Sequence, residues 1–220
     1  MPKKNKQKTP IKTWFHRKKK KNRWQYIVND KYTIKAKSEW YRARSAYKLL
    51  EIQDKFNLIK SNFLIIDIWS APWSFLQVIS KIINKEKIIW IDLKEIKTFP
   101  QQNIYTIVWN IFDYNHINQN ITKIIWDKRF DLITSDLAPN TSWRFDVDQY
   151  ASVELNIEVC NFSDKFLKKW WNMLLKVFKW EDFYELVNEI KKRFTKMKTY
   201  KPLASRDFSR EEYVICLWKK

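Results

Sequence analysis

The chain has 220 residues, 45% of them hydrophobic and 17% aromatic, and its formal net charge is +19 at pH 7. A chain of this length and apolar content can bury a sizeable core, which excludes disorder throughout. Glycine is absent and tryptophan occurs 13 times, although average usage would supply about 15 glycines. Because turns and helix ends usually need a residue that tolerates positive φ, other residues must stand where glycine is expected.

The positive charge is concentrated at the N-terminus, where residues 1–23 contain 11 lysines and arginines and no acidic residue. Such an arm favours a polyanionic partner, because lysine and arginine displace the counterions that condense on phosphate backbones. A solubilising tail is the alternative interpretation. An anionic membrane surface is disfavoured, because no apolar helical face accompanies the charge.

Several other classes of protein find no support in the sequence. No stretch approaches the roughly 18 apolar residues of a membrane span, and no apolar run of a signal peptide follows the basic N-terminus. We therefore expect a cytoplasmic protein that does not associate with membranes. Cys160 and Cys216 lie in apolar surroundings without metal-ligand spacing and are predicted to be core thiols. His16 and His116 are isolated, so no metal site is predicted.

Helices and strands are predicted to alternate along the rest of the chain. The spacing of apolar residues over Ser38–Asn57 predicts one amphipathic helix, to which Arg42, Arg44 and Lys48 give a basic face. Short apolar runs predict buried strands at Phe63–Ile68, Lys87–Ile91, Ile104–Val108, Phe130–Ser135 and Asn172–Phe178, and a closing pair at Met197–Lys201 and Tyr213–Trp218. Helices are predicted at Ser74–Asn84, near Tyr114–Ile125, at Asp148–Lys168 and at Glu181–Phe194.

This alternation predicts an α/β fold with a mainly parallel sheet and helices on both faces, because consecutive parallel strands need right-handed crossovers. In such sheets ligands bind outside the carboxyl ends of the strands, where the strand order reverses. The loops that follow the strands are therefore the places to look for functional residues.

The first such loop lies within DIWSAPWSFLQV, residues 67–78, between a strand and a helix. A backbone that turns directly from a strand into a helix presents amide N–H groups to a ligand, provided that side chains leave room. Asp92 ends the next strand, 19 residues after Trp73, which is the spacing at which nucleotide-binding folds place a carboxylate on ribose hydroxyls. A helix-capping role for Asp92 is the alternative.

Two further residues indicate chemistry at strand ends. The run FDLITSDLAPN, residues 130–140, delivers Asp136 to the edge of the sheet, and the run NMLLKVF places Lys176 among apolar neighbours. Burying an ammonium group is costly unless it is paired or becomes neutral, so Lys176 is a candidate catalytic residue. A lysine that extends its ammonium group to solvent from the strand end is the alternative.

Six motifs follow one another between about Lys31 and the end of the chain. They are YKLLEIQ (47–53), the loop at 67–75, IDL (91–93), SDLAPN (135–140), LLKVF (174–178) and SREEY (209–213). In their order and spacing they together resemble the FtsJ-like family of heat-shock ribosomal RNA 2′-O-methyltransferases.

The resemblance implies a Rossmann-like methyltransferase fold with a seven-stranded sheet over residues 31–220, preceded by a basic, disordered RNA-binding tail over residues 1–30. It also implies a catalytic tetrad of Lys48, Asp136, Lys176 and Glu211. S-adenosylmethionine is the implied cofactor, with contacts at Trp69, Trp73, Phe75, Asp92, Asn110 and Asp136. Asn110 departs from the family, which usually has an aspartate there.

These residue types suit methyl transfer to a ribose hydroxyl, in which an alcohol loses its proton as a sulfonium loses its methyl group. A lysine can accept that proton only when its pKa falls toward neutrality, which a second cation and partial burial can cause. Lys48 is expected to be that neighbour of Lys176, with Asp136 orienting the amine and Glu211 holding Lys48 or the substrate. A Lys176 that stays charged and stabilises the alkoxide is the alternative.

The basic arm and the basic helix favour RNA as the substrate, because its 2′-hydroxyl is the group that distinguishes it from DNA. The resemblance implies a uridine of large-subunit ribosomal RNA as the target and a monomeric enzyme. Related branches of the family methylate tRNA or mRNA caps. A non-catalytic RNA-binding or ribosome-assembly factor is the alternative of a different class, since Trp69 and Trp73 would crowd the cofactor.

Six of the tryptophans occupy positions where the resembled family carries glycine. They are Trp69, Trp73, Trp90, Trp170, Trp171 and Trp180. Five more stand in turn-like or strand-end contexts, at positions 40, 109, 126, 143 and 218. We therefore hypothesise that these positions are glycine in the cell, in a genome that reads the codon UGA as glycine. Trp170 and Trp171 are expected to follow a helix that ends in LKK, at a capping turn.

Overall fold

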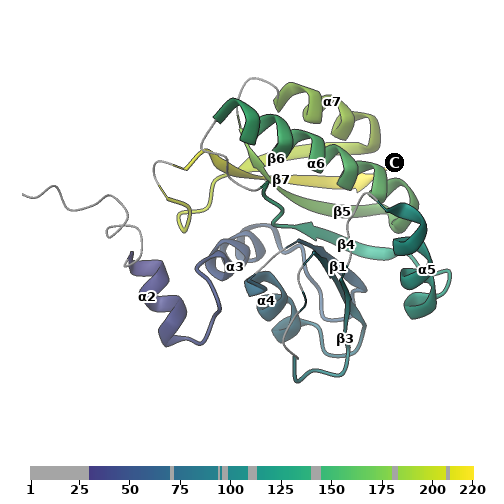
Figure 1. The fold of residues 1–220 in the computed structure, drawn as a ribbon, viewed down its shortest axis with the longest axis horizontal. Coiled ribbons are helices and arrows are strands. Elements are labelled where there is room, and N and C mark those ends of the chain that lie inside the picture. Colours follow the sequence, from purple (N-terminus) through teal and green to yellow (C-terminus); the bar gives the residue numbers. More distant parts are fainter. Residues whose placement is uncertain are drawn as a thin grey trace, which may run out of the picture.

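A computed structural model describes most of the chain after the basic arm (Figure 1). The residues that it describes are 30–69, 72–93, 95, 99–108, 113–139, 145–179, 183–206 and 209–220. The predicted tail at residues 1–30 falls, apart from its last residue, outside them, as do Asn110, Trp109, Trp143 and Trp180. Among the described residues, no helix has the length and apolar character needed to cross a membrane.

A single seven-stranded sheet forms the centre of the fold, in the order β3-β2-β1-β4-β5-β7-β6. Neighbouring strands are parallel from β3 through β5, whereas β7 runs antiparallel to both β5 and β6. The strands are β1 (Ile65–Ile68), β2 (Ile88–Asp92), β3 (Ile104–Val108), β4 (Phe130–Ser135), β5 (Leu167–Phe178), β6 (Phe194–Tyr200) and β7 (Glu211–Lys219). The order reverses direction between β1 and β4, which is where ligands bind in doubly wound sheets.

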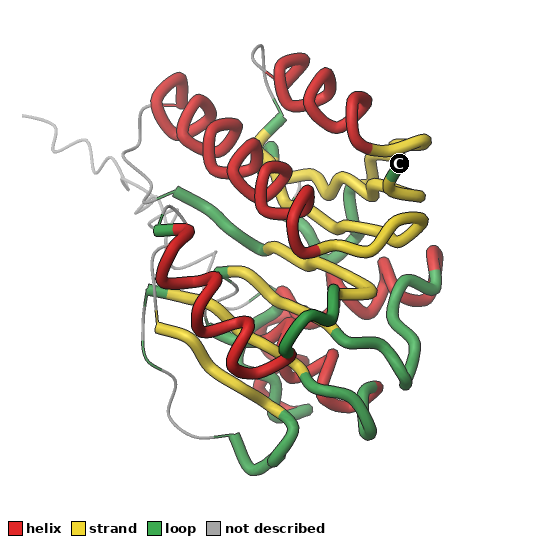
Figure 2. Tube along the Cα trace, turned by 90° about the vertical axis from the view of Figure 1, so that its right-hand side faces the viewer, coloured by secondary structure: helices red, strands yellow, loops and turns green. Residues whose placement is uncertain are grey.

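Helices cover both faces of this sheet (Figure 2). The helices α3 (Ser45–Phe56) and α4 (Ser74–Ile82) pack on one face and form one apolar core with it. The other face carries α5 (Tyr114–Ile125), α6 (Phe145–Phe166) and α7 (Phe183–Arg193), which share a second core. A short helix, α2 (Lys31–Ser38), lies to the side of α3 (Figure 1).

The burial pattern explains why these runs form these strands. Every residue of β1, β2 and β4 is buried, as expected for central parallel strands that are covered on both faces. The edge strand β6 is mostly exposed and carries Lys196 and Lys198, and lysines on an edge strand discourage pairing with other chains. The predicted fold class, an α/β fold with a mainly parallel seven-stranded sheet, is confirmed.

Two helix predictions are wrong in part. The predicted helix Ser38–Asn57 is interrupted, because α2 ends at Ser38 and α3 begins only at Ser45. The backbone between them turns at Trp40, whose φ of 63° is incompatible with a continuing helix. The predicted helix Asp148–Lys168 ends at Phe166, so that the residues LKK start β5 rather than end a helix. The helix α2 itself was not predicted; Asp30 caps it by accepting hydrogen bonds from the Tyr32 and Thr33 amides.

Positive backbone φ angles, in turns and within strands, fall mainly on tryptophan. Seven described residues have positive φ, and six of them are tryptophan; the seventh is Asn57, which ends α3 in the left-handed conformation that asparagine tolerates. The six are Trp40 (63°), Trp69 (50°), Trp73 (71°), Trp126 (61°), Trp170 (68°) and Trp218 (60°). Positive φ is found in only a few per cent of residues other than glycine and is least suited to bulky ones. These tryptophans therefore adopt the backbone of glycine.

Candidate active site

The candidate site lies at the carboxyl ends of β1 and β4, where the strand order reverses. Ile68 pairs with Ser135 across these two strands, so the loop that starts at Trp69 begins beside Asp136. On the other side of β1, the Trp69 amide donates to the Ile91 carbonyl over 2.7 Å, next to Asp92. The topology thus brings together the two strand-end carboxylates and Trp69, the first residue of the segment 69–75, hereafter the cofactor loop.

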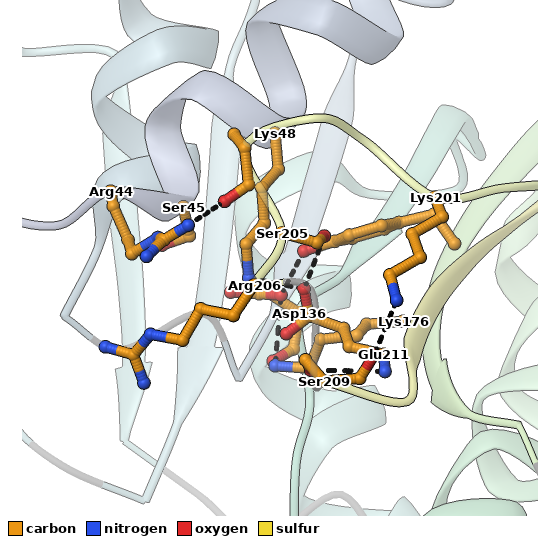
Figure 3. A network of polar contacts seen from close by, with 12 residues as sticks. Arg44, Ser45, Lys48, Asp136, Lys176, Lys201, Ser205, Arg206, Ser209 and Glu211 are labelled. Atoms are coloured by element: carbon orange, nitrogen blue, oxygen red, sulfur yellow. Dashed lines mark hydrogen bonds and ion pairs between the residues drawn. The ribbon is translucent and has the colours of Figure 1, made fainter. Parts of the chain in front are cut away.

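Four charged side chains converge at this edge from four elements, as Figure 3 shows. Lys48 comes from α3, Asp136 from the residue after β4, Lys176 from β5 and Glu211 from the start of β7. Lys176 pairs with Tyr213 across the antiparallel β5–β7 ladder, and Glu211 lies two residues before Tyr213. Side chains two residues apart share a face of the sheet, so Lys176 and Glu211 both point toward the face that α3 covers.

Lys176 and Asp136 form a buried ion pair in which Lys176 Nζ lies 3.0 Å from Asp136 Oδ1. The same ammonium group also donates to the Asp136 carbonyl. The Tyr213 hydroxyl donates to Asp136 Oδ1 over 2.8 Å. Burial, together with the Asp136 and Glu211 carboxylates, raises the pKa of Tyr213 well above its ordinary value, so the phenol stays protonated and remains a donor. Asp136 is therefore fixed from two sides.

Lys48 and Glu211 form a second pair, with Lys48 Nζ 2.5 Å from Glu211 Oε1. Only 11% of each side chain is exposed, so the charges are largely withdrawn from water. Ser205 donates its hydroxyl to Glu211 Oε1 over 3.1 Å, and the Glu211 amide donates to the Ser209 hydroxyl over 3.2 Å. The loop between β6 and β7 thus positions Glu211, and Glu211 in turn pairs with Lys48.

All four members of the expected tetrad are brought together by the fold. The network also contains residues without an expected role, among them Tyr213, which donates to Asp136, and Ser205, which donates to Glu211. Tyr213 could have been found from its spacing, since it follows Glu211 by two residues and so shares its face of β7. Ser205 could not, because it lies in an irregular loop that only the tertiary structure places.

Two of the expected cofactor residues, Asp92 and Phe75, lie in or beside the cofactor loop but can offer a ligand different groups. Asp92 is buried at the carboxyl end of β2, beside the cofactor loop, which suits a contact with a ribose. The Phe75 side chain is fully buried and stacks on Tyr213 with ring centroids 6.0 Å apart. Phe75 therefore offers a ligand only its backbone.

Trp69 and Trp73 do not fit a ligand-binding loop. Both have positive φ, and the indole Nε1 atoms of both are buried without a hydrogen-bond partner. An unpartnered buried donor costs about 1–3 kcal/mol. Trp73 contacts Trp90 edge-on, with ring centroids 6.3 Å apart, and the indoles of Trp69 and Trp73 pack against the two apolar cores. The position of the loop suits a nucleotide cofactor, whereas its two tryptophan side chains do not.

The expected basic face of the α3 region is also divided. Arg42 is exposed, with its guanidinium over the rings of Trp73 (4.5 Å) and Phe99 (4.9 Å). Arg44 instead turns inward and donates to the Asp30 carboxylate and to the Ala204 carbonyl. The expectation that Arg44 contributes to an exposed basic face is therefore wrong, because its guanidinium ties α2 and the β6–β7 loop to α3.

Polar contacts join α3 to the helix that follows the cofactor loop. The hydroxyls of Ser45 and Ser74, at the first residues of α3 and α4, share a buried hydrogen bond. Gln77 of α4 accepts from the Arg42 amide over 2.7 Å and donates to the Trp40 carbonyl over 3.0 Å. The helix that carries Lys48 is thereby fixed relative to the cofactor loop.

Comparison with known proteins places this arrangement in a family. The family model described as FtsJ-like methyltransferase matches residues 41–219. Proteins named ribosomal RNA large subunit methyltransferase E are similar over most of their length. One from Neorickettsia sennetsu is 37% identical over 201 residues, covering 90% of this chain and 92% of its own. One from Methylobacillus flagellatus is 38% identical over 194 residues, covering 88% and 92%.

Solved structures agree with this placement. A ribosomal RNA methyltransferase from Plasmodium falciparum superimposes with a TM-score of 0.72 at 29% identity, covering 81% of this chain and 98% of its own. Fibrillarin from Aeropyrum pernix, solved with natively bound S-adenosyl-L-methionine, gives a TM-score of 0.55 at 13% identity and covers 80% and 75%. The likeness to fibrillarin concerns the fold alone.

Proposed function

Because the chain belongs to the FtsJ-like methyltransferase family, we propose that it methylates the 2′-hydroxyl of a ribose in large-subunit ribosomal RNA. The expected base is uridine, and the expected methyl donor is S-adenosyl-L-methionine. The observation that carries the proposal is the convergence of two buried lysine–carboxylate pairs at the strand-order switch point. The names of the relatives support ribosomal RNA as the substrate class.

The residues around the switch point support binding of the donor, which supplies a methyl group on a positively charged sulfur. The cofactor loop would present its backbone amides, and Asp92 would accept hydrogen bonds from ribose hydroxyls. Asp136 lies beside the start of the loop and so links the donor site to the tetrad. Asn110, the expected adenine contact, lies outside the described residues.

We assign Lys176 to the reacting hydroxyl. In the simplest scheme, its neutral amine would accept the hydroxyl proton as the 2′-oxygen takes the methyl group from the sulfonium of the donor, whose sulfur would leave as a neutral thioether. Asp136 holds the amine in place through the 3.0 Å contact, and Tyr213 holds Asp136. Lys48 contributes a second positive charge near the developing oxyanion, and its partner Glu211 fixes its position. Alignment of this kind can contribute several kcal/mol, up to about 10.

The remaining expectations are that the enzyme is a monomer and works in the cytoplasm. All four tetrad side chains come from one chain, so the site requires no second copy. A ribosomal substrate is consistent with a cytoplasmic location. Size-exclusion chromatography with light scattering tests the first expectation.

The function is tested by transfer of a radiolabelled methyl group from S-adenosyl-L-methionine to isolated large ribosomal subunits, with tRNA and capped mRNA as competing substrates. Two forms are compared: the chain with tryptophan at all 13 positions, and a form with glycine at those positions, hereafter the glycine form. We expect the glycine form to label ribosomal RNA at a 2′-O-methyl nucleoside. Preferential labelling of tRNA or caps would move the enzyme to another branch of the family.

A non-catalytic RNA-binding role is favoured by one observation, the buried unpartnered indoles of Trp69 and Trp73 in the cofactor loop. Calorimetry decides between the two functions. If both forms bind large-subunit RNA but neither binds S-adenosyl-L-methionine, the catalytic proposal is wrong. Binding of the donor by the glycine form supports it.

A further inference from the structure

The misfit at the cofactor loop belongs to a pattern that extends over the whole fold. We propose that the positions occupied by tryptophan are glycine in the protein made by its own cell. Eight tryptophans lie among the described residues, and six of them have positive φ. A frequency of a few per cent for residues other than glycine predicts fewer than one. The structure thus supports, from backbone geometry, what composition alone suggests.

Trp126 gives the clearest single case. It ends α5 with φ 61° and ψ −120°, close to the first central residue of a type II′ turn, a position that glycine dominates. Its side chain is 79% exposed, so packing of the indole does not compensate for the conformation. Trp40 and Trp170 are likewise exposed, at 88% and 70%. Exposed indoles at positive φ have no packing role that would explain them.

The same substitution restores the cofactor loop. Without the indoles of Trp69 and Trp73, the two buried unpartnered Nε1 atoms disappear, and the loop keeps only backbone groups at these positions, which are the groups that bind ligands at helix N-termini. Reassignment of a single codon explains all of these positions, if UGA specifies glycine rather than tryptophan in this genome. This proposal does not depend on the identity of the substrate.

The gene and the fold each provide a test. We expect UGA at all six positive-φ positions, and a UGG codon at any of them would overturn the proposal for that position.

In the glycine form, residue 126 is then varied among glycine, alanine and tryptophan. Glycine should be the most stable, with alanine raising the unfolding equilibrium constant about fivefold or more because its Cβ opposes this conformation.

The exposed helical residue Lys123, three positions earlier in α5, is the matched control. There, Lys123→Ala should be more stable than Lys123→Gly, because glycine disfavours a helix interior. If alanine or tryptophan matches glycine at position 126 while the control behaves as expected, the conformational basis of the proposal is wrong.

A separate observation concerns Glu51, one turn after Lys48 on α3. Its carboxylate accepts three hydrogen bonds from the segment that leads into the β6–β7 loop. The donors are the Tyr200 hydroxyl, the Leu203 amide at 2.9 Å and the Ala204 amide at 3.4 Å. The bond from Tyr200 and the burial that goes with it raise the pKa of Tyr200 to about 12. Leu203 itself is 79% exposed, whereas Ala204 is buried in an apolar cluster with Ala36 and Tyr47. The hydrogen bonds to Glu51 therefore add to the packing of Ala204 in holding this loop.

The anchored segment continues directly into the active site. Ser205 follows Ala204 and donates to Glu211, the partner of Lys48. Lys48 and Glu51 are three residues apart on one helix and lie on the same side of it. One helix therefore carries both the lysine and the carboxylate that fixes the loop against it.

We infer that Glu51 is a positioning residue for the Lys48–Glu211 pair, an inference that rests on the proposed function. In the glycine form, Glu51→Gln should lower kcat about tenfold with little change in KM for S-adenosyl-L-methionine, because the donor site is on other elements. Tyr200 should titrate closer to its ordinary value in this variant, and the Leu203 and Ala204 amides should exchange hydrogen faster.

Glu39→Gln is the matched control, since Glu39 also accepts a tyrosine hydroxyl, that of Tyr47, at 2.8 Å but no loop amide in the part of the chain that is described. It should leave kcat unchanged. If the two variants change kcat equally, or if Glu51→Gln leaves kcat unchanged, the proposed role of Glu51 is wrong. The titration and exchange measurements need no substrate, so they test the anchor even if the RNA methylation assay fails.

Discussion

Lys176 and Asp136 meet as a buried ion pair, with Nζ and Oδ1 3.0 Å apart, although β4 and β5 are separated along the chain by the whole of α6. Parallel pairing of these strands places both residues at the same edge of the sheet. This pair lies closest to the proposed chemistry, so the first prediction concerns it.

Lys176→Arg should lower kcat by about 10²-fold or more if the amine is the general base, because arginine keeps the charge but cannot release its proton. Initial rates between pH 6 and 10 in the glycine form measure this. Lys179→Arg is the control, since Lys179 pairs with Glu212 on the exposed side at 3.3 Å. Substantial activity of Lys176→Arg would instead assign a permanently charged, oxyanion-stabilising role.

Tyr213→Phe should keep the fold and reduce kcat several-fold. The ring still stacks on Phe75, but Asp136 loses the hydroxyl that donates to Oδ1. Because the pKa of Tyr213 is raised well above 10, the phenol is a donor at all working pH values. The activity ratio of the variant to the parent should therefore stay constant from pH 6 to 9. A ratio that changes over this range would show that Tyr213 itself titrates.

The Lys48–Glu211 pair should show strong coupling in a double-mutant cycle. Removing one partner of a largely buried pair leaves an uncompensated charge, and breaking such pairs costs about 3–5 kcal/mol. Lys48→Met and Glu211→Gln should each destabilise the fold, and the double variant should be more stable than the sum of the two losses predicts. Urea unfolding measures the cycle, and additive losses would contradict a direct interaction.

Lys219→Met should destabilise the fold by about 2 kcal/mol, because charged hydrogen bonds to backbone carbonyls are worth about 1.5–3 kcal/mol. The Lys219 ammonium donates to the carbonyls of Ser163 and Asp164, in the last turn of α6, and of Leu167, the first residue of β5. Thermal unfolding measures the effect. Lys220→Met is the control, since that ammonium bonds an exposed carbonyl at Lys191; equal losses would contradict a capping role for Lys219.

Removal of residues 1–29 should weaken RNA binding and flatten its salt dependence, without changing the affinity for S-adenosyl-L-methionine. The deleted segment contains the 11 basic residues of the arm, and each phosphate contact adds about 0.7–0.9 to the slope of log K against log salt. Fluorescence anisotropy with a fragment of large-subunit RNA at several salt concentrations measures this. An unchanged slope would favour the solubilising-tail interpretation.

Most of the strands and helices were predictable because central parallel strands form continuous apolar runs. The runs around β1, β2 and β4 are fully buried, and the alternation between them was visible in the sequence. Predictions were less accurate at the boundaries of elements, where the backbone conformation of one or a few residues decides where a helix or strand begins or ends. The break at Trp40 and the start of β5 at Leu167 are examples, because tryptophan and the residues LKK carry no signal for a turn or a strand.

The sequence by itself determined the fold class and the anomaly of a chain that lacks glycine, since these depend on apolar periodicity and composition, and the order of the motifs predicted the tetrad and its pairing. The tertiary structure alone decided the contacts around those four residues. It turned Arg44 inward and gave Tyr213, Ser205 and Glu51 their contacts. Such contacts join segments that are distant along the chain. They exist only once the sheet order and the pleat of β5 and β7 have fixed which side chains share a face.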